Sequence, residues 1–303
     1  MAVKTPRCAA VSVDVDSLYL YYRIHGLDES AATNAVWEKG VTRFAELFDE
    51  VGVKGTFFVV ASDLERFPEA RAIADQLVAA GHEIGSHTWS HPYDLTHLSD
   101  EAIAQEVDKA HALLSEVRGT PVQGFRAPGY HMTDAVYRAL VQSDYLYSSS
   151  IFPSPPYYLA KVSIMGLMRL MGKESQAIAG DPRIMVASRH PHHRRSLLEL
   201  PMTVLPKIRF PIIGTSLILL GKRGMRMLRP AISRIDFYNL EFHGIDMCDA
   251  EIDGINLSSQ PDLKVPIKQK RATIKDTLEH MRDHWETAPL EKIAPYFKHP
   301  QAR

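Results

Sequence analysis

Short apolar runs alternate with amphipathic segments along the first half of the chain. Residues 9–15 are small and β-branched and end in acidic side chains, which is typical of a buried strand. A second buried strand is expected at residues 55–60, and further strands are expected at residues 82–87, 123–126 and 145–149. The tyrosine-rich residues 19–22 lack this pattern, and we expect a loop there.

The segments between the strands carry apolar residues at helical spacing. Residues 34–50 place Trp37, Val41, Phe44 and Phe48 on one face. Further helices are expected at residues 68–80, 99–119 and 133–143. Because this alternation is typical of a mostly parallel sheet, the fold class is α/β, with the sheet either open or closed into a barrel. Reactive side chains at the ends of several strands favour a barrel with its site at one rim.

The second half of the chain is less regular. We interpret residues 151–230 as an insertion over the rim, within a single domain of residues 1–303. Strands are expected to resume at residues 199–204 and at residues 235–243, and the second of these ends in a histidine. A late amphipathic helix is expected at residues 272–285.

Residues 209–229 combine an apolar stretch with basic residues. The apolar part has roughly a dozen residues, which is too short to span a bilayer. Lys222, Arg223, Arg226 and Arg229 follow it. One interpretation is a buried strand followed by a basic surface helix. The other is peripheral contact with anionic lipid.

Composition says more about the cellular location of the protein than about its reaction. The 303 residues have a net charge of -1, which gives no whole-chain argument for nucleic-acid binding. Two cysteines cannot form a disulfide framework and favour a reduced compartment. The first residues lack the apolar run of a signal peptide. We therefore expect a cytoplasmic protein, with association with the inner face of the membrane as a further hypothesis.

Two pairs of residues are candidates for chemistry. His87 and His91 lie four apart at the end of an expected strand, and such a pair can ligate one metal ion. A chance pair is the alternative, since the chain has 14 histidines. Asp14 and Asp16 lie two apart, so a regular strand points both to one face. Adjacent carboxylates repel unless a cation or proton separates them, so one can bind metal while the other acts as a base. A pair that caps a loop is the alternative.

Four motifs carry a more specific signal. They are SVDVD, GSHTWSH, FRAPGYH and LEFH, and their order and spacing resemble those of the polysaccharide deacetylase family, also called carbohydrate esterase family 4. The resemblance implies a distorted (β/α)7–8 barrel that uses one divalent metal ion to hydrolyse acetyl groups on sugars. The Asp-Val-Asp form is similar to the branch that includes intracellular peptidoglycan-type deacetylases and lipid-linked sugar deformylases.

The resemblance also implies a metal site and a base. Asp16, His87 and His91 match the metal ligands, with Zn²⁺ as the expected ion and Co²⁺, Mn²⁺ or Ni²⁺ as alternatives. Asp14 matches the catalytic base, and Arg126 matches the arginine that pairs with it. Such a pairing would hold the base ionised and oriented.

The remaining implied roles concern the oxyanion and the leaving group. The turn Pro128, Gly129 and Tyr130 matches the position that binds the oxyanion and the substrate. His243 matches the histidine that protonates the leaving amine. The motif that would orient this histidine is not found, and the candidates for that role are Asp181 and Asp246.

Together these features predict a metal-dependent hydrolase. It would remove an N-acetyl or N-formyl group from an amino sugar that forms part of a nucleotide- or lipid-linked precursor. Water activated by the metal attacks the amide carbonyl, while an aspartate accepts a proton and a histidine donates one. A linear amide hydrolase acting on a non-sugar substrate is one alternative. A non-catalytic binding protein that keeps the fold is the other.

Overall fold

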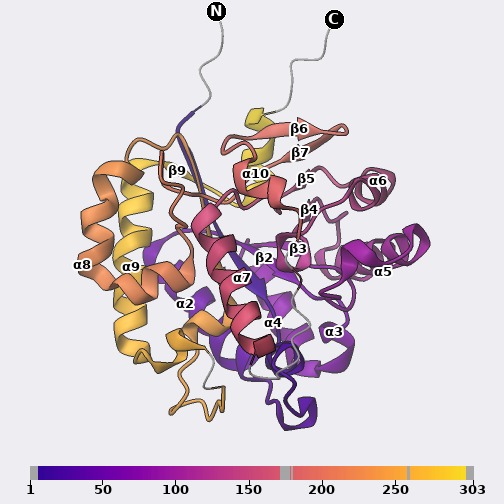
Figure 1. The fold of residues 1–303 in the computed structure, drawn as a ribbon, viewed down its shortest axis with the longest axis horizontal. Helices are drawn as coiled ribbons and strands as arrows, with labels where there is room; N and C mark the ends of the chain where they lie inside the picture. Colours follow the sequence, from indigo (N-terminus) through magenta and orange to yellow (C-terminus); the bar gives the residue numbers. More distant parts are fainter. Residues whose placement is uncertain (1–5, 171–177, 179, 258–259, 298–303) are drawn as a thin grey trace, which may run out of the picture.

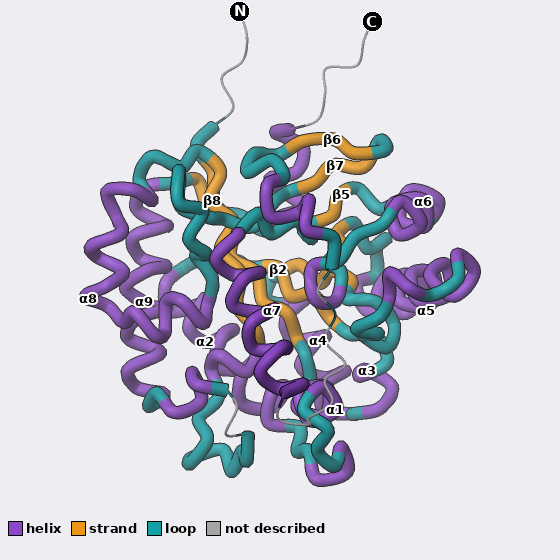
Figure 2. Tube along the Cα trace, in the orientation of Figure 1, coloured by secondary structure: helices purple, strands orange, loops and turns teal. Residues whose placement is uncertain are grey.

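A curved, mostly parallel sheet lies at the centre of the molecule (Figures 1 and 2). The computed structural model describes residues 6–170, 178, 180–257 and 260–297. Within them the strand order is β6-β7-β5-β4-β3-β2-β1-β8, and β9 pairs with β1. All pairs are parallel except β6 with β7. The strands are β1 (Cys8–Val15), β2 (Thr56–Val59), β3 (Glu83–Ser86), β4 (Gly124–Phe125), β5 (Tyr147–Ser148), β6 (His192–Arg194), β7 (Leu197–Glu199), β8 (Phe237–His243) and β9 (Glu286–Thr287).

Residues 200–204 connect the two ends of this sheet. The Leu200 N–H donates to the carbonyl oxygen of Ser148 in β5 at 2.8 Å. Three residues later, the Thr203 N–H donates to the carbonyl oxygen of Asn239 in β8 at 3.0 Å. The strand expected at residues 199–204 is therefore shifted, because β7 ends at its first residue and the rest is extended backbone that bridges to β8. The expected α/β fold with a distorted barrel is confirmed.

Helices cover the outside of the sheet. They are α1 (Leu18–Ile24), α2 (Thr42–Val51), α3 (Asp63–Arg66), α4 (Pro68–Ala79), α5 (Asp100–Arg118), α6 (Asp134–Gln142), α7 (Pro155–Leu170), α8 (Gly214–Ile232), α9 (Ile267–His284) and α10 (Leu290–Ile293). Figure 1 shows α8 and α9 side by side on one flank, α5 and α6 on the other, and α7 crossing in front of the strands. The expected helices at residues 68–80, 99–119, 133–143 and 272–285 are confirmed.

The helix expected at residues 34–50 begins differently from the prediction. A π-helical turn, Val36–Val41, precedes α2, and the two together bury the predicted apolar face. Its four apolar residues are fully buried: Trp37, Val41, Phe44 and Phe48. The Ser99 and Thr133 side chains accept N–H groups at the starts of α5 and α6, as side-chain caps do.

The loop expected at residues 19–22 is wrong, because this segment forms α1. The helix is held by contacts that a local pattern does not reveal. The hydroxyls of Ser17 and Tyr19 donate to the carboxylate of Asp63 at 2.5 and 2.9 Å. Leu20 packs against Val60, which follows β2. Tertiary contacts from a distant segment thus make helical a stretch whose sequence is mainly aromatic.

The barrel interior is polar next to the site. Ser12 and Asp14 of β1 both contact the guanidinium of Arg126. On the neighbouring strand β8, Asn239 and Glu241 are fully buried polar residues. The residues between them belong to the main hydrophobic core: Val11, Val13, Leu240 and Phe242. Period-two alternation therefore points polar side chains inward and apolar side chains toward the helices.

Residues 151–230 contribute a helix that covers the sheet and a strand that belongs to it. α7 lies over the carboxyl ends of the strands, whereas β7 is part of the sheet itself. Residues 171–177 and 179 of this region lie outside the described residues. No helix in the described part of the chain combines the length and apolar character needed to cross a bilayer.

Candidate active site

The carboxyl ends of β1 and β3 bring three candidate metal ligands together. Asp16 follows β1, whereas His87 and His91 follow β3. Asp16 Oδ1 lies 3.2 Å from His87 Nε2 and 3.5 Å from His91 Nε2. All three side chains are buried, and one ligand atom from each lies within 4.8 Å of the others. The expected convergence of these residues is therefore present.

The loop after β3 fixes the ring of His87 and the backbone of His91. His87 Nδ1 lies 2.7 Å from the carbonyl oxygen of Arg126, so it donates there and leaves Nε2 facing Asp16. Thr88 and His91 both adopt left-handed backbone conformations, with φ of 68° and 56°. The His91 N–H donates to the Thr88 hydroxyl at 3.0 Å. Such backbone strain is typical of functional sites.

These three residues fit a divalent cation. Asp16 Oδ1 is buried and makes no regular hydrogen bond within the described residues. Burial raises the pKa of Asp16, but His91 and His87 outweigh it and lower the pKa below its usual range. Burial lowers the pKa of His91 to about 4, which favours the neutral imidazole that metals bind. Two imidazoles and one carboxylate form a donor set suited to Zn²⁺ and related ions.

Asp14 lies beside this cluster and pairs with Arg126. The guanidinium Nη1 donates to Asp14 Oδ1 at 2.6 Å, and both side chains are buried. Arg126 also donates to the Ser12 hydroxyl and to the carbonyl and hydroxyl oxygens of Ser149. Asp14 Oδ2 makes no hydrogen bond within the described residues. Burial raises the pKa of Asp14, and the charge of Arg126 opposes that shift. One carboxylate oxygen is thus fixed while the other stays available.

His243, at the end of β8, faces the same cluster. Its Nε2 lies 3.8 Å from Asp16 Oδ2, and its Nδ1 lies 2.9 Å from Glu241 Oε1. Burial lowers the pKa of His243, but the Glu241 carboxylate outweighs it and raises the pKa well above its ordinary value. The contact with Glu241 also directs Nε2 toward Asp16.

Neither candidate named for orienting the His243 ring makes that contact. Asp181 instead pairs with Arg183 at 2.8 Å. The carboxylate of Asp246 accepts the backbone N–H of His243 at 3.0 Å, so this carboxylate fixes the main chain. Glu241 is the residue that sequence reasoning missed. Its signal was period-two spacing, since it lies two positions before His243 on the same strand.

The turn after Arg126 borders the cluster. Gly129 and Tyr130 have φ of 60° and 65°. The Tyr130 N–H donates to the carbonyl oxygen of Ala127 at 3.0 Å, and Pro128 has no N–H. Gly129 is therefore the member of this turn whose N–H is the candidate for binding an oxyanion. The Tyr130 hydroxyl donates to Glu241 Oε1 at 3.3 Å.

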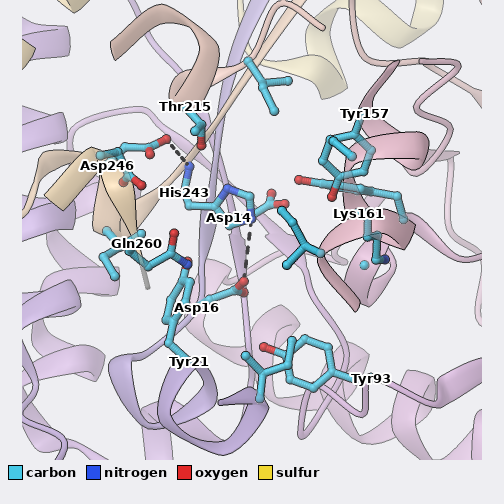
Figure 3. A pocket seen from close by; sticks show the side chains of 18 of the residues that line it. Asp14, Asp16, Tyr21, Tyr93, Tyr157, Lys161, Thr215, His243, Asp246 and Gln260 are labelled. Carbon is cyan, nitrogen blue, oxygen red and sulfur yellow. Dashed lines mark hydrogen bonds and ion pairs between the residues drawn. The ribbon is translucent and has the colours of Figure 1, made fainter. Parts of the chain in front are cut away.

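A cavity of about 570 Å³ opens above these groups (Figure 3). Asp14, Asp16, both loop histidines and His243 line one end of it. Its walls are mainly apolar and come from α7, α8 and neighbouring segments, with Ala160, Ile164, Ile213 and Leu219 among them. Ile164 is 59% exposed and Leu219 55% exposed, so the apolar lining continues to the molecular surface.

Comparison with known proteins shows which family this chain resembles. The family model described as polysaccharide deacetylase matches residues 31–148. A peptidoglycan deacetylase from Helicobacter pylori is 25% identical over 158 residues, which are 50% of this chain and 52% of that protein. The resemblance to the polysaccharide deacetylase family is confirmed. In three curated relatives, all named as deacetylases or deacetylase-like, the similar stretch spans only 27%, 32% and 52% of the relative's length.

Solved structures extend the likeness to the whole polysaccharide deacetylase fold. A Mycobacterium smegmatis protein assigned to the polysaccharide deacetylases superposes with a TM-score of 0.62 at 18% identity, covering 98% of this chain and 92% of that one. A structure named Puue allantoinase superposes with a TM-score of 0.61 at 15% identity, covering 99% and 93%. At these identities the comparisons show the fold alone, and the substrate has to be argued from the site.

Three basic residues of the 209–229 stretch share one partner within the protein. Lys222, Arg226 and Arg229 on α8 all form ion pairs with Asp276 on α9, at 3.1, 2.7 and 2.7 Å. The apolar part of the stretch begins with two isolated β-bridges, Pro211 with Val204 and Ile213 with Glu241, and continues as the first turns of α8. These cations therefore contribute to packing of the two helices, and lipid contact through this stretch stays a prediction.

Proposed function

We propose that this protein is a metal-dependent hydrolase that removes an N-acetyl or N-formyl group from an amino sugar. The observation that carries the proposal is the convergence of three kinds of group on one cavity. These are a fitting set of metal ligands, a carboxylate with one free oxygen, and a histidine paired with a carboxylate. A structural metal site would require only the first kind.

Asp16, His87 and His91 would hold the divalent cation, with Zn²⁺ expected and Co²⁺, Mn²⁺ or Ni²⁺ as alternatives. When bound, such an ion supplies Lewis-acid polarisation of the amide carbonyl and of a water molecule. Of these ligands, His87 is held in place by the hydrogen bond that its Nδ1 donates to the Arg126 carbonyl oxygen. A preorganised ligand set is what a catalytic site needs.

Asp14 and His243 would move the protons. Asp14 Oδ2 accepts the proton of the attacking water, while Arg126 keeps the carboxylate oriented through Oδ1. His243 Nε2 donates a proton to the leaving amine, which would otherwise be a poor leaving group. The Gly129 N–H would bind the carbonyl oxygen as negative charge develops on it.

The cavity supports a substrate larger and more apolar than one sugar ring. Apolar walls from α7 and α8 favour an amino sugar attached to an apolar carrier, such as a lipid-linked precursor, over a bare sugar. A cytoplasmic location with contact at the membrane surface is consistent with that substrate and stays a prediction.

An acyl-release assay tests the proposed function directly. Metal-loaded protein is incubated with N-acetyl and N-formyl amino sugars, free and carrier-linked, and with small linear amides, and released acetate or formate is measured. We expect release from the amino sugars at higher kcat/KM than from the linear amides. The reverse order would favour the linear amide hydrolase. Absence of release from every compound would overturn the proposal in favour of a binding protein.

Glu241→Gln should impair turnover without loss of metal. Glu241 contacts His243 and does not line the cavity, so it acts as a positioning residue. Loss of its charge should lower turnover of an N-acetyl substrate by roughly 10- to 100-fold. Hydrolysis of an activated aryl acetate should change little, because its leaving group needs no proton.

Glu199→Gln is the matched control for this substitution. Glu199 is equally buried but accepts backbone N–H groups of Ser150 and Ile151 away from the cavity. It should lower thermal stability without separating amide from ester turnover. Equal losses on amide and ester in Glu241→Gln, or a fall in bound metal, would show that Glu241 is merely structural.

A further inference from the structure

A lysine lines the cavity without a role in the proposed chemistry. Lys161, on α7, shares the cavity with Asp14 and His243. Figure 3 shows it beside Tyr157, on the opposite side of the cavity from Asp246 and Gln260. The acyl-transfer steps need no group at this position, so Lys161 requires a separate explanation.

Lys161 lies beside a neutral side chain, and it has no acidic partner among the described residues. Its Nζ lies 3.1 Å from His131 Nε2. Burial lowers the pKa of His131 to about 4, and the charge of Lys161 acts in the same direction, so the imidazole is neutral; the same Nε2 also lies 3.2 Å from the carbonyl oxygen of Ile178. Burial also lowers the pKa of Lys161, to about 8. Within the described residues, no Asp or Glu forms an ion pair with this lysine.

The charges of the cavity are segregated. Its carboxylates belong to the side that carries the metal ligands and His243, and they are Asp14, Asp16, Asp246 and Asp262. The α7 wall offers apolar side chains and the single ammonium of Lys161. An ammonium that is partly desolvated without an anion is unfavourable, and a bound anion offsets this cost. The arrangement fits a ligand that has an acylated end and an anionic group at a distance from it.

We propose that Lys161 is the binding residue for an anionic group of the substrate, a phosphate attached to the acylated amino sugar. This inference rests on the proposed function, because it places the acyl group at the Asp16–His87–His91 end of the cavity. The ammonium donates its protons to the phosphate oxygens. The residue thereby selects sugar phosphates over neutral sugars.

The phosphate could come from a lipid carrier or from a nucleotide. The apolar residues next to Lys161 on α7, Ala160 and Ile164, line the same cavity and lead to the surface. They suit an alkyl chain better than a nucleoside, which needs hydrogen-bonding partners for its base and ribose. Both sources share the sugar phosphate, and separate probes distinguish them.

Binding measurements test the proposal without relying on turnover. Metal-loaded protein is titrated calorimetrically with N-acetylglucosamine, its 1-phosphate, the decyl phosphodiester of that phosphate, and the uridine diphosphate sugar. We expect wild-type protein to bind the 1-phosphate roughly 10- to 100-fold more tightly than the neutral sugar. Tighter binding of the decyl compound would identify a lipid source, and tighter binding of the uridine compound a nucleotide source.

Substitutions assign the preference to the lysine. Lys161→Met should lose the preference for phosphate but still bind the neutral sugar. Lys161→Arg should keep most of the preference for phosphate. Lys39→Met removes one positive charge from an exposed position outside the cavity and should change nothing. Equal affinity of wild-type protein for phosphate and neutral sugar, or no binding of any phosphate, overturns the proposal. So does an equal loss of both ligands in Lys161→Met when its thermal stability is unchanged.

The two proposals fail in different ways. Acyl release from neutral amino sugars without any preference for phosphate would leave the proposed function standing and remove the role of Lys161. A Lys161-dependent preference for phosphate in a protein that releases neither acetate nor formate would do the reverse.

Discussion

His87→Ala protein is expected to contain no bound metal and to lose acyl-release activity. The substitution removes one of two imidazoles from a cluster in which Asp16 and His91 cannot complete the donor set alone. Because Lewis-acid polarisation contributes several kcal/mol to such reactions, kcat/KM should fall by on the order of 10³-fold or more. Metal content by mass spectrometry and activity at saturating Zn²⁺ provide the two measurements.

His190→Ala is the control for this substitution. His190 is exposed and lies outside the cavity, so its removal should leave both metal content and turnover unchanged. Asp16→Ala and His91→Ala should behave as His87→Ala does. Full activity in a metal-free His87→Ala protein would refute the metal site and, with it, the proposed chemistry.

Asp14→Asn should separate metal binding from turnover. The ligand cluster does not depend on Asp14, so the variant should keep its metal. An amide cannot accept a proton as a carboxylate does, and turnover should fall by roughly 10²- to 10⁴-fold. The variant should also be less stable than the wild type, because the buried guanidinium of Arg126 loses its ion pair while it keeps its contacts with Ser12 and Ser149.

Asp16→Asn supplies the comparison. It changes a carboxylate to an amide two residues away and is expected to reduce metal affinity as well as turnover. Asp14 would not be the base if Asp14→Asn kept wild-type turnover with full metal content. If Asp14→Asn lost metal to the same extent as Asp16→Asn, the division of roles between the two aspartates would be reversed.

The parts of the fold that could be predicted are those with local signals. β1 and β8 are marked by short apolar runs that end in polar residues, and α5 by a serine cap and a closing glycine. Parallel strands place their carboxyl ends at the same edge, so the residues that follow β1, β3 and β4 were expected to meet. The contacts among Asp14, Asp16, His87, His91 and Arg126 have this origin.

The features that could not be predicted depend on contacts between distant segments. α1 is stabilised by hydrogen bonds to Asp63 and by packing against Val60. Both residues lie far from α1 in the sequence, so a local pattern cannot reveal these contacts. Glu241 carried a usable signal, since it shares a strand face with His243. The position of Lys161 carried none, because only the placement of α7 over the barrel brings this lysine to the cavity.

Arg126 joins two parts of the site that are usually considered separately. Its side chain holds Asp14, and its own peptide carbonyl holds His87. Any displacement of His87, for example by an ion of different radius, is therefore transmitted through a single residue to Asp14. Exchange of Zn²⁺ for a larger ion is thus expected to shift the proton affinity of Asp14, whereas Asp14→Asn leaves the contact that holds His87 intact.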